Sequence, residues 1–339
     1  FERRVSAQRE VLEAEAAPRN AYELGFGYSS TDGFGVEAEW TRRNLTGRAD
    51  ALSVSTTLGE IRQDLTLALT RPHAAGLGHT ANFGTSLQRE ENEAFTREGA
   101  SLFASVDAST RLRISRSYGA SLSADRFDNV ASGVTDALVL SGFADLRNDT
   151  TGFSLDPRDG SIFELRLEPT VSTGDETLAF LRTTAEARVF ESFAENDALT
   201  LAARVGAGWL EPLAGSANDA PPDRRFYAGG GGSVRGYPYH SIYPRERDLL
   251  GLAPGGDGMV EASLEARWRF HERWGAAFFV DGGTAFDDWS DAGALSWGAG
   301  LGVRYDLGFA PLRVDFAFPL DRDQAQSDVA LYISIGQAF

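Results

Sequence analysis

The chain has 339 residues, a formal net charge of −17 and no cysteine, and these features exclude several classes of protein. Without cysteine there is no disulfide framework and no cysteine-ligated metal. The acidity argues against a nucleic-acid partner, because phosphate binding requires clustered positive charge. All 32 basic residues are arginine, which also excludes a lysine-dependent phosphate-binding loop.

The first segment of the chain differs from the rest. The chain starts with Phe1, and residues 10–17 have helical character without a sustained apolar face. We expect residues 1–19 to be a linker, with a disordered terminus as the alternative. No window of the sequence approaches 18 consecutive apolar residues, so no transmembrane helix is predicted.

From residue 20 onward the dominant pattern has a period of two, which predicts β-strands. In residues 258–270, for example, apolar residues from Val260 to Phe270 alternate with glutamate, serine and arginine. The pattern predicts sixteen strands, at residues 20–28, 34–41, 50–58, 61–70, 80–89, 97–107, 112–124, 135–145, 161–171, 177–190, 197–209, 258–270, 274–282, 294–305, 311–319 and 329–338.

The composition of the two strand faces predicts the fold class. One face is aliphatic and aromatic, and the other is dense in Arg, Asp, Glu, Gly and Thr. Strands of about ten residues with this pattern are typical of outer-membrane barrels, which face lipid outside and a polar lumen inside. A soluble sandwich has shorter strands and a propeller has repeats, which this sequence lacks. We therefore predict an all-β, 16-stranded antiparallel transmembrane β-barrel of the bacterial outer membrane.

The connections between the predicted strands differ in length. The sequences "STDG" (30–33) and "FHER" (270–273) are tight turns, and we expect both to face the periplasm. Residues 210–257 form a far longer connection without a strand pattern. Loops of this length in a compact fold are usually functional.

The long loop contains the sequence "GGGGSVRGYPYH" at 229–240. Its glycines let the backbone turn sharply in a narrow space. An arginine inside a barrel requires an acidic partner, because an isolated charge is costly there. Glu265 and Asp281 both fall on the polar faces of their strands and are the candidate partners of Arg235. The alternative is a solvent-exposed arginine at the loop tip.

The sequence offers little support for catalysis. No two of the four histidines, His73, His79, His240 and His271, share metal-ligand spacing. No Ser-His-Asp set can be identified from spacing, although a barrel hydrolase remains an alternative. Lumen-facing charges such as Arg304 and Asp306 are interpreted as ordinary polar lining. We predict neither an enzyme nor a metal or cofactor site.

Several stretches resemble the Omp85 superfamily of outer-membrane assembly and secretion proteins. The most specific is "RRFYAGGGGSVRGY" (224–237), followed in order by "SLEARWRF" and "FFVDGG". The resemblance covers nearly the whole chain from about residue 20. It includes "LGFGYSSTDGFGVEAEWTRRNLTGRAD", "DPRDGSIFELRLEP", "GAGLGVRYDLGFAPLRVDFAFPL" and the final "LYISIGQAF".

The resemblance implies a long loop folded into the lumen and a particular domain order. Members carry periplasmic POTRA domains ahead of the barrel, so residues 1–19 would be the linker from missing POTRA domains and residues 20–339 the barrel. The first strands look most like the TamA type, with the BamA type second and two-partner secretion third. The motif would comprise Val234, Arg235, Gly236 and Tyr237, and its wall contacts Asp281, Glu265 and Gly283.

The function implied is the insertion or export of β-rich clients through a lateral seam between the first and last strands. The alternative is a secretion pore that passes clients through the lumen. Gly336 is expected to permit an inward kink of the last strand. The seam residues would be Tyr22, Leu24, Phe26, Tyr28, Ile333, Ile335, Gly336 and Phe339.

The partners implied are outer-membrane lipid and β-barrel clients such as autotransporters. An inner-membrane-anchored, periplasm-spanning protein of the TamB type is a further candidate. No cofactor and no nucleic acid are expected.

Overall fold

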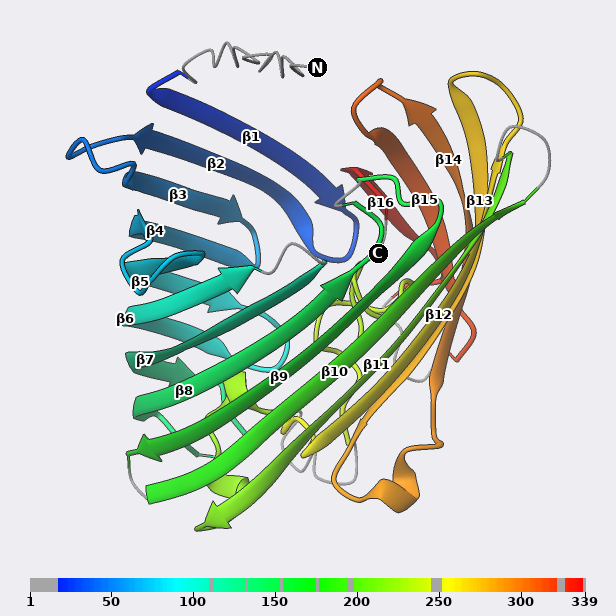
Figure 1. Cartoon of the computed structure of the whole chain (residues 1–339). Coiled ribbons are helices and arrows are strands. Elements are labelled where there is room, and N and C mark those ends of the chain that lie inside the picture. The colour runs from blue at the N-terminus through cyan, green and yellow to red at the C-terminus, as the bar shows by residue number, and fades with distance from the viewer. Residues whose placement is uncertain are drawn as a thin grey trace, which may run out of the picture.

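The computed structural model describes residues 18–109, 113–131, 133–152, 155–174, 177–193, 198–244, 252–321 and 327–337. Its strands form one closed antiparallel barrel in which each strand pairs with its neighbours in sequence and β1 pairs with β16 (Figure 1). The strands are β1 (Asn20–Ser29), β2 (Gly33–Arg43), β3 (Ala51–Gly59), β4 (Arg62–Pro72), β5 (His79–Glu91), β6 (Thr96–Ser109), β7 (Ile114–Asp128), β8 (Asp136–Asp149), β9 (Gly160–Thr173), β10 (Thr177–Phe193), β11 (Leu199–Ala214), β12 (Gly258–Arg269), β13 (Trp274–Phe286), β14 (Ser296–Asp306), β15 (Pro311–Pro319) and β16 (Ala330–Ile335).

The alternation of the sequence becomes the two faces of the wall. On β12, Leu264 and Trp268 are 66% and 52% exposed, whereas Glu261 and Glu265 are buried on the lumenal side. Large apolar side chains on the outside and charges on the inside are the arrangement that a lipid environment requires. All sixteen predicted strands are present, which confirms the predicted fold class.

The strands of the barrel wall differ in length. Strands β7 to β11 have 14 to 17 residues, whereas β15 has nine and β16 only six. Figure 1 shows the long strands on one side of the barrel and the short β16 beside β1. The seam between the first and last strands is therefore the part of the wall with the shortest strand.

The pairing across the seam is short. β1 and β16 share three residue pairs, Gly27↔Ser334, Tyr28↔Ile333 and Ser29↔Tyr332. By contrast, β1 pairs with β2 along all ten of its residues. Among the described residues, the segment 20–26 of β1 thus has a strand partner on one side only.

The prediction that both tight turns face the periplasm was wrong. Residues 30–32 connect β1 to β2, and residues 270–273 connect β12 to β13. Successive connections of an antiparallel barrel alternate between its two ends, so a turn after an odd strand and a turn after an even strand lie at opposite ends. The turn at 30–32 lies on the side of the long loop, where Asp32 accepts a hydrogen bond from the Tyr239 backbone N–H.

The long loop connects β11 to β12 and folds into the lumen. It begins later than predicted, because β11 continues to Ala214. Two short 3₁₀ turns, η2 (Ala217–Asp219) and η3 (Pro222–Arg224), start it, and its backbone pairs with itself at Phe226↔Gly256 and Ala228↔Ile242. Residues 1–17, which hold most of the predicted linker, lie outside the described residues. No helix in the described ranges is long and apolar enough to cross a membrane.

Candidate functional site: the lumenal loop and the wall that it contacts

Glycines set the shape of the loop tip. Gly230 and Gly236 have φ angles of 104°, a backbone region that L side chains rarely adopt. The Gly230 N–H donates to the Tyr237 carbonyl at 3.0 Å, which closes the tip into a compact turn. A side chain at Gly236 would come within 3.0 Å of the Pro319 backbone nitrogen, so the tip also lies directly against the wall.

Arg235 projects from this turn into the wall and is 2% exposed. Its Nε and Nη2 donate to the two oxygens of Asp281 at 2.6 and 2.9 Å, which is a bidentate pairing. Its Nη1 donates to Glu265 at 2.8 Å and lies 3.4 Å from Asp315. The guanidinium also stacks 3.4 Å above the ring centre of Phe279.

The Arg235 guanidinium remains charged although it is buried. Burial acts to lower its pKa, but the hydrogen bonds and charge of Asp281, with the charges of Glu265 and Asp315, raise the pKa above its usual value. Three carboxylates around one cation form a strongly attractive site for that cation. Removal of the arginine would leave the buried Asp281 carboxylate without its bidentate partner.

Three further arginines surround the same carboxylates. Arg267 donates to Glu265 at 2.8 Å, Arg304 donates to Asp315, and Arg313 lies 3.4 Å from Asp315. All three are buried on the inner wall. We call the whole group the lumenal charge cluster; it comprises Arg235, Arg267, Arg304, Arg313, Glu265, Asp281 and Asp315.

The neighbours of Arg235 in the motif make the other close contacts. Val234 is fully buried, and its Cγ2 is so close to Gly283 that a Cβ there would lie 2.7 Å from it. The Tyr237 hydroxyl lies 3.0 Å from the Trp297 carbonyl and 2.9 Å from the Asp321 carbonyl. The loop thereby contacts both β13 and the ends of β14 and β15.

The loop also reaches the seam. The Gly236 N–H donates to the Tyr332 hydroxyl on β16 at 3.0 Å, and Thr31 in the β1–β2 turn lies 3.4 Å from the same hydroxyl. Tyr332 is 2% exposed, so this junction is shielded from water. The Tyr332 hydroxyl therefore joins the loop to β16 and to the turn that follows β1.

A second anchor holds the base of the glycine run. Arg204 on β11 donates to the carbonyls of Gly232 and Ser233 at 2.8 and 3.1 Å. Glu261 on β12 lies 3.1 Å from Arg204 and accepts a hydrogen bond from the Ser233 hydroxyl. The end of the glycine run is thus held against the wall through the carbonyl groups of Gly232 and Ser233.

His240, at the end of the sequence 229–240, lies in an aromatic stack. Its ring lies 3.8 Å from the ring centre of Tyr239 and 4.8 Å from that of Tyr227. Burial lowers the pKa of His240 to about 3, although Glu90 lies 4.0 Å from its Nδ1. The imidazole is therefore neutral at physiological pH.

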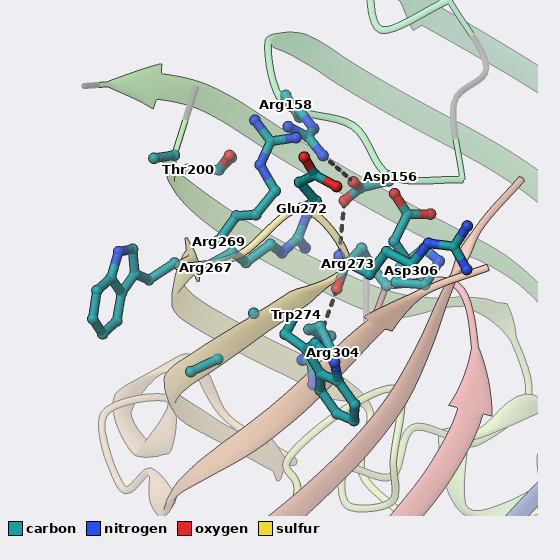
Figure 2. A pocket seen from close by; sticks show the side chains of 16 residues that line it. Asp156, Arg158, Thr200, Arg267, Arg269, Glu272, Arg273, Trp274, Arg304 and Asp306 are labelled. Carbon is teal, nitrogen blue, oxygen red and sulfur yellow. Dashed lines mark hydrogen bonds and ion pairs between the residues drawn. The ribbon is translucent and has the colours of Figure 1, made fainter. Parts of the chain in front are cut away.

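A small pocket lies at the other end of the lumen, beside the 270–273 turn (Figure 2). It has room for a volume of about 60 Å³, and Arg267 and Arg304 of the lumenal charge cluster line it. Figure 2 shows that acidic groups accompany the arginines in this pocket. The labelled charged residues are Asp156, Arg158, Arg267, Arg269, Glu272, Arg273, Arg304 and Asp306.

The structure brings the predicted motif and wall residues into one site, but it divides the predicted seam residues. Tyr28 and Ile333 face each other across the seam. Tyr22, Leu24 and Phe26 are exposed on the outer face without a described partner on β16. Ile335 pairs with β15, Gly336 follows it with a φ of 96°, and Phe339 lies outside the described residues.

Sequence reasoning missed part of the site. Asp315, Arg313 and Arg304 were on predicted polar faces, and Arg304 was interpreted as ordinary lining. Strand parity placed these residues inside the barrel but did not show that they meet Arg235. Tyr332 was also missed, because an aromatic residue on a barrel strand usually indicates the lipid side. Among the described residues, no group of three or more His, Cys, Asp and Glu could hold a metal ion.

Comparisons with known proteins agree with this geometry. Residues 44–339 match the model of the Omp85 superfamily domain. The outer membrane protein assembly factor BamA of Nitratidesulfovibrio vulgaris is 28% identical over 338 residues, covering 93% of this chain. The chain spans 41% of the length of that curated relative.

Solved structures show the same fold. BamA from Haemophilus ducreyi lacking POTRA domains 1–3 superposes with a TM-score of 0.75 at 17% identity, covering 94% of this chain and 70% of the other. CdiB from Acinetobacter baumannii superposes with a TM-score of 0.59 at 14% identity, covering 95% of this chain and 60% of the other. At these identities the likeness concerns the fold alone.

A substitution of Gly298 tests the docking of the loop without removing a charge. A Cβ at Gly298 would overlap the Arg235 carbonyl oxygen, whereas one at Gly35 has nothing within 4 Å. We expect Gly298→Ala to weaken loop docking by about 1–3 kcal/mol, as overpacking does. Limited trypsin digestion should then cleave faster after Arg235. Equal resistance of Gly298→Ala and the control Gly35→Ala would contradict the close contact.

The neutral His240 predicts a pH dependence of loop docking. Because the folded pKa is about 3, below the ordinary 6.5, docking is unaffected above pH 6.5 and weakens as the pH falls from 6.5 toward 3. The maximum slope is about 1.4 kcal/mol per pH unit. Hydrogen exchange of residues 229–240 at pH 7 and pH 4.5 should reveal the loss. In His240→Phe this pH dependence should disappear, and its persistence would show that another group is responsible.

Proposed function

Because the chain belongs to the Omp85 superfamily, we propose that it is the barrel of an outer-membrane assembly factor, which inserts β-rich client proteins sideways into the bacterial outer membrane. The barrel belongs to that membrane, and its curated relative is named an outer membrane protein assembly factor. The clients and the lateral route are our proposal. We assign no enzymatic step to the barrel.

The observation that carries the proposal is the short seam. Three residue pairs join β1 to β16, and residues 20–26 of β1 leave one backbone edge without a described strand partner. An unpaired edge is a template for another strand. In lipid the free energy gained by such pairing is large, because each backbone group without a hydrogen bond costs several kcal/mol there. A client strand that pairs with this edge would satisfy both chains and could leave into the membrane.

The lumenal charge cluster supports a role for the docked loop in keeping the barrel in a state that can accept a client strand. The loop that carries Arg235 contacts β13 through Asp281 and the seam through Tyr332. We propose that the docked loop holds the paired end of the seam in place. A displaced loop would release Tyr332 and loosen the pairing between β1 and β16.

The subtype within the superfamily, the partner and the clients are also proposals. The BamA relative and the CdiB neighbour are both compatible with a superfamily barrel, and the TamA subtype rests on the first strands alone. A periplasm-spanning partner of the TamB type and autotransporter clients belong to that subtype. POTRA domains ahead of the barrel, with residues 1–19 as their linker, are proposed on the same basis.

Passage of clients through the lumen is the alternative. The docked loop opposes it, because Arg235 and its neighbours occupy the lumen with several buried hydrogen bonds. Lumenal passage would require that all of them break. The two routes differ in which part of the barrel must open.

A disulfide across the seam separates the two routes. Tyr28→Cys with Ile333→Cys joins an observed pair, and no other cysteine is present to compete. We expect oxidation to block client assembly in reconstituted vesicles and reduction to restore it. The control Leu301→Cys with Phe316→Cys locks a pair within the wall and should have no effect. Full activity of the oxidised seam variant would favour the lumenal route.

Removal of Arg235 tests the role of the charge cluster. Arg235→Ala leaves three buried carboxylates without their central cation, which should weaken loop docking by roughly 3–5 kcal/mol. We expect client assembly to fall while the barrel still forms and still shifts on heating in gel electrophoresis. Arg89→Ala, at a half-exposed site, is the control. Wild-type assembly by Arg235→Ala would rule out a functional loop anchor.

A further inference from the structure

The chain leaves the wall immediately after β16. Gly336 still donates its N–H to the Pro311 carbonyl at 2.8 Å, but its φ of 96° turns the next residue inward. The side-chain amide of Gln337 then makes two hydrogen bonds inside the barrel. Its oxygen accepts from Arg304 Nε at 3.0 Å, and its nitrogen donates to Asp156 at 2.8 Å.

The partners of Gln337 come from distant parts of the wall. Arg304 lies on β14, and Asp156 lies in the connection between β8 and β9. Asp156 is itself held by Arg158 at 3.1 Å. The end of the last strand is thus bound to lumenal groups, and its amide is satisfied at both of its polar atoms.

The register of the seam shows what this arrangement prevents. The observed pairs end at Gly27↔Ser334. Because the two strands are antiparallel, any further pairs would match lower residue numbers on β1 with higher residue numbers on β16. Continued pairing would place Phe26 opposite Ile335 and Leu24 opposite Gln337. Gln337 cannot occupy that position and also contact Arg304 and Asp156 in the lumen. The two arrangements are mutually exclusive.

Side-chain parity makes continued pairing of β16 with β1 beyond Ser334 unfavourable. Ala330 and Tyr332 are buried on the inner face, whereas Ile333 pairs with Tyr28, which is 42% exposed on the outer face. In a continuous strand Gln337 would share the outer face with Ile333 and Ile335. Its amide would then face lipid without hydrogen-bond partners, which is costly. The inward turn at Gly336 removes this cost.

We propose that Gln337 is a positioning residue that latches the end of β16 to the lumenal wall and so keeps the edge of β1 at residues 20–26 unpaired. The use of that free edge for accepting clients rests on the proposed assembly function. The hydrogen bonds that hold Gln337 do not depend on that function. The latch is also connected to the loop. Arg304 contacts both Gln337 and Asp315, and Asp315 lies 3.4 Å from Arg235.

Cysteine crosslinking in the cysteine-free chain tests the latch. Phe26→Cys with Ile335→Cys marks the next pair that a longer seam would form, and Tyr28→Cys with Ile333→Cys marks an observed pair of the same parity. In oxidised outer-membrane vesicles the first pair should crosslink poorly in the native background. Gln337→Leu, which suits the lipid face, should raise its crosslinking about tenfold, as should Asp156→Ala, because each loses hydrogen bonds of the latch.

Controls distinguish loss of the latch from misfolding of the barrel and from loss of the assembly function. The Tyr28–Ile333 cysteine pair should crosslink equally in all backgrounds, which shows that the barrel is intact. Gln63→Leu, on β4 opposite the exposed Leu58, should leave the Phe26–Ile335 crosslink unchanged. If that crosslink is equally efficient with and without Gln337, the latch is overturned. Because no client is needed, this result is independent of whether the barrel assembles proteins.

Discussion

The organisation of this barrel depends on the requirement that charges buried in its lumen have partners. Arg235 enters a space lined by Asp281, Glu265 and Asp315, and bidentate pairing fixes the position of its guanidinium. Breaking such a buried pair costs several kcal/mol, so the loop that carries the arginine is held where the wall carboxylates are. A flexible glycine-rich segment thereby becomes an ordered internal support.

This support and the seam share residues. The Tyr332 hydroxyl receives a hydrogen bond from the loop and lies next to the β1–β2 turn, so it acts at the paired end of the seam. Arg304 belongs to the lumenal charge cluster and also binds Gln337, beyond the unpaired end. Both ends of the seam are therefore linked to the position of one loop. Displacement of that loop would act on both.

The limits of sequence reasoning are visible at particular residues. Parity assigned Asp281 and Glu265 to the lumen, and their pairing with Arg235 required only that the loop enter it. Parity also assigned Asp315 and Arg304 to the lumen, but spacing along the chain does not reveal which inward residues meet across the barrel. The turns at 30–32 and 270–273 were assigned to one end because both are short. Their ends follow from the order of the strands, and length carries no such information.

The sequence by itself determined the period of the strands, their number and the side on which each residue lies, because alternation is a local property of an extended chain. It also determined that Gly336 can turn where other residues are strained. Only the tertiary structure decided how far the seam closes and where Gln337 binds. Both depend on a competition between backbone pairing with β1 and side-chain contacts from β14 and the β8–β9 connection. Such a competition exists only once the barrel has brought those distant groups together.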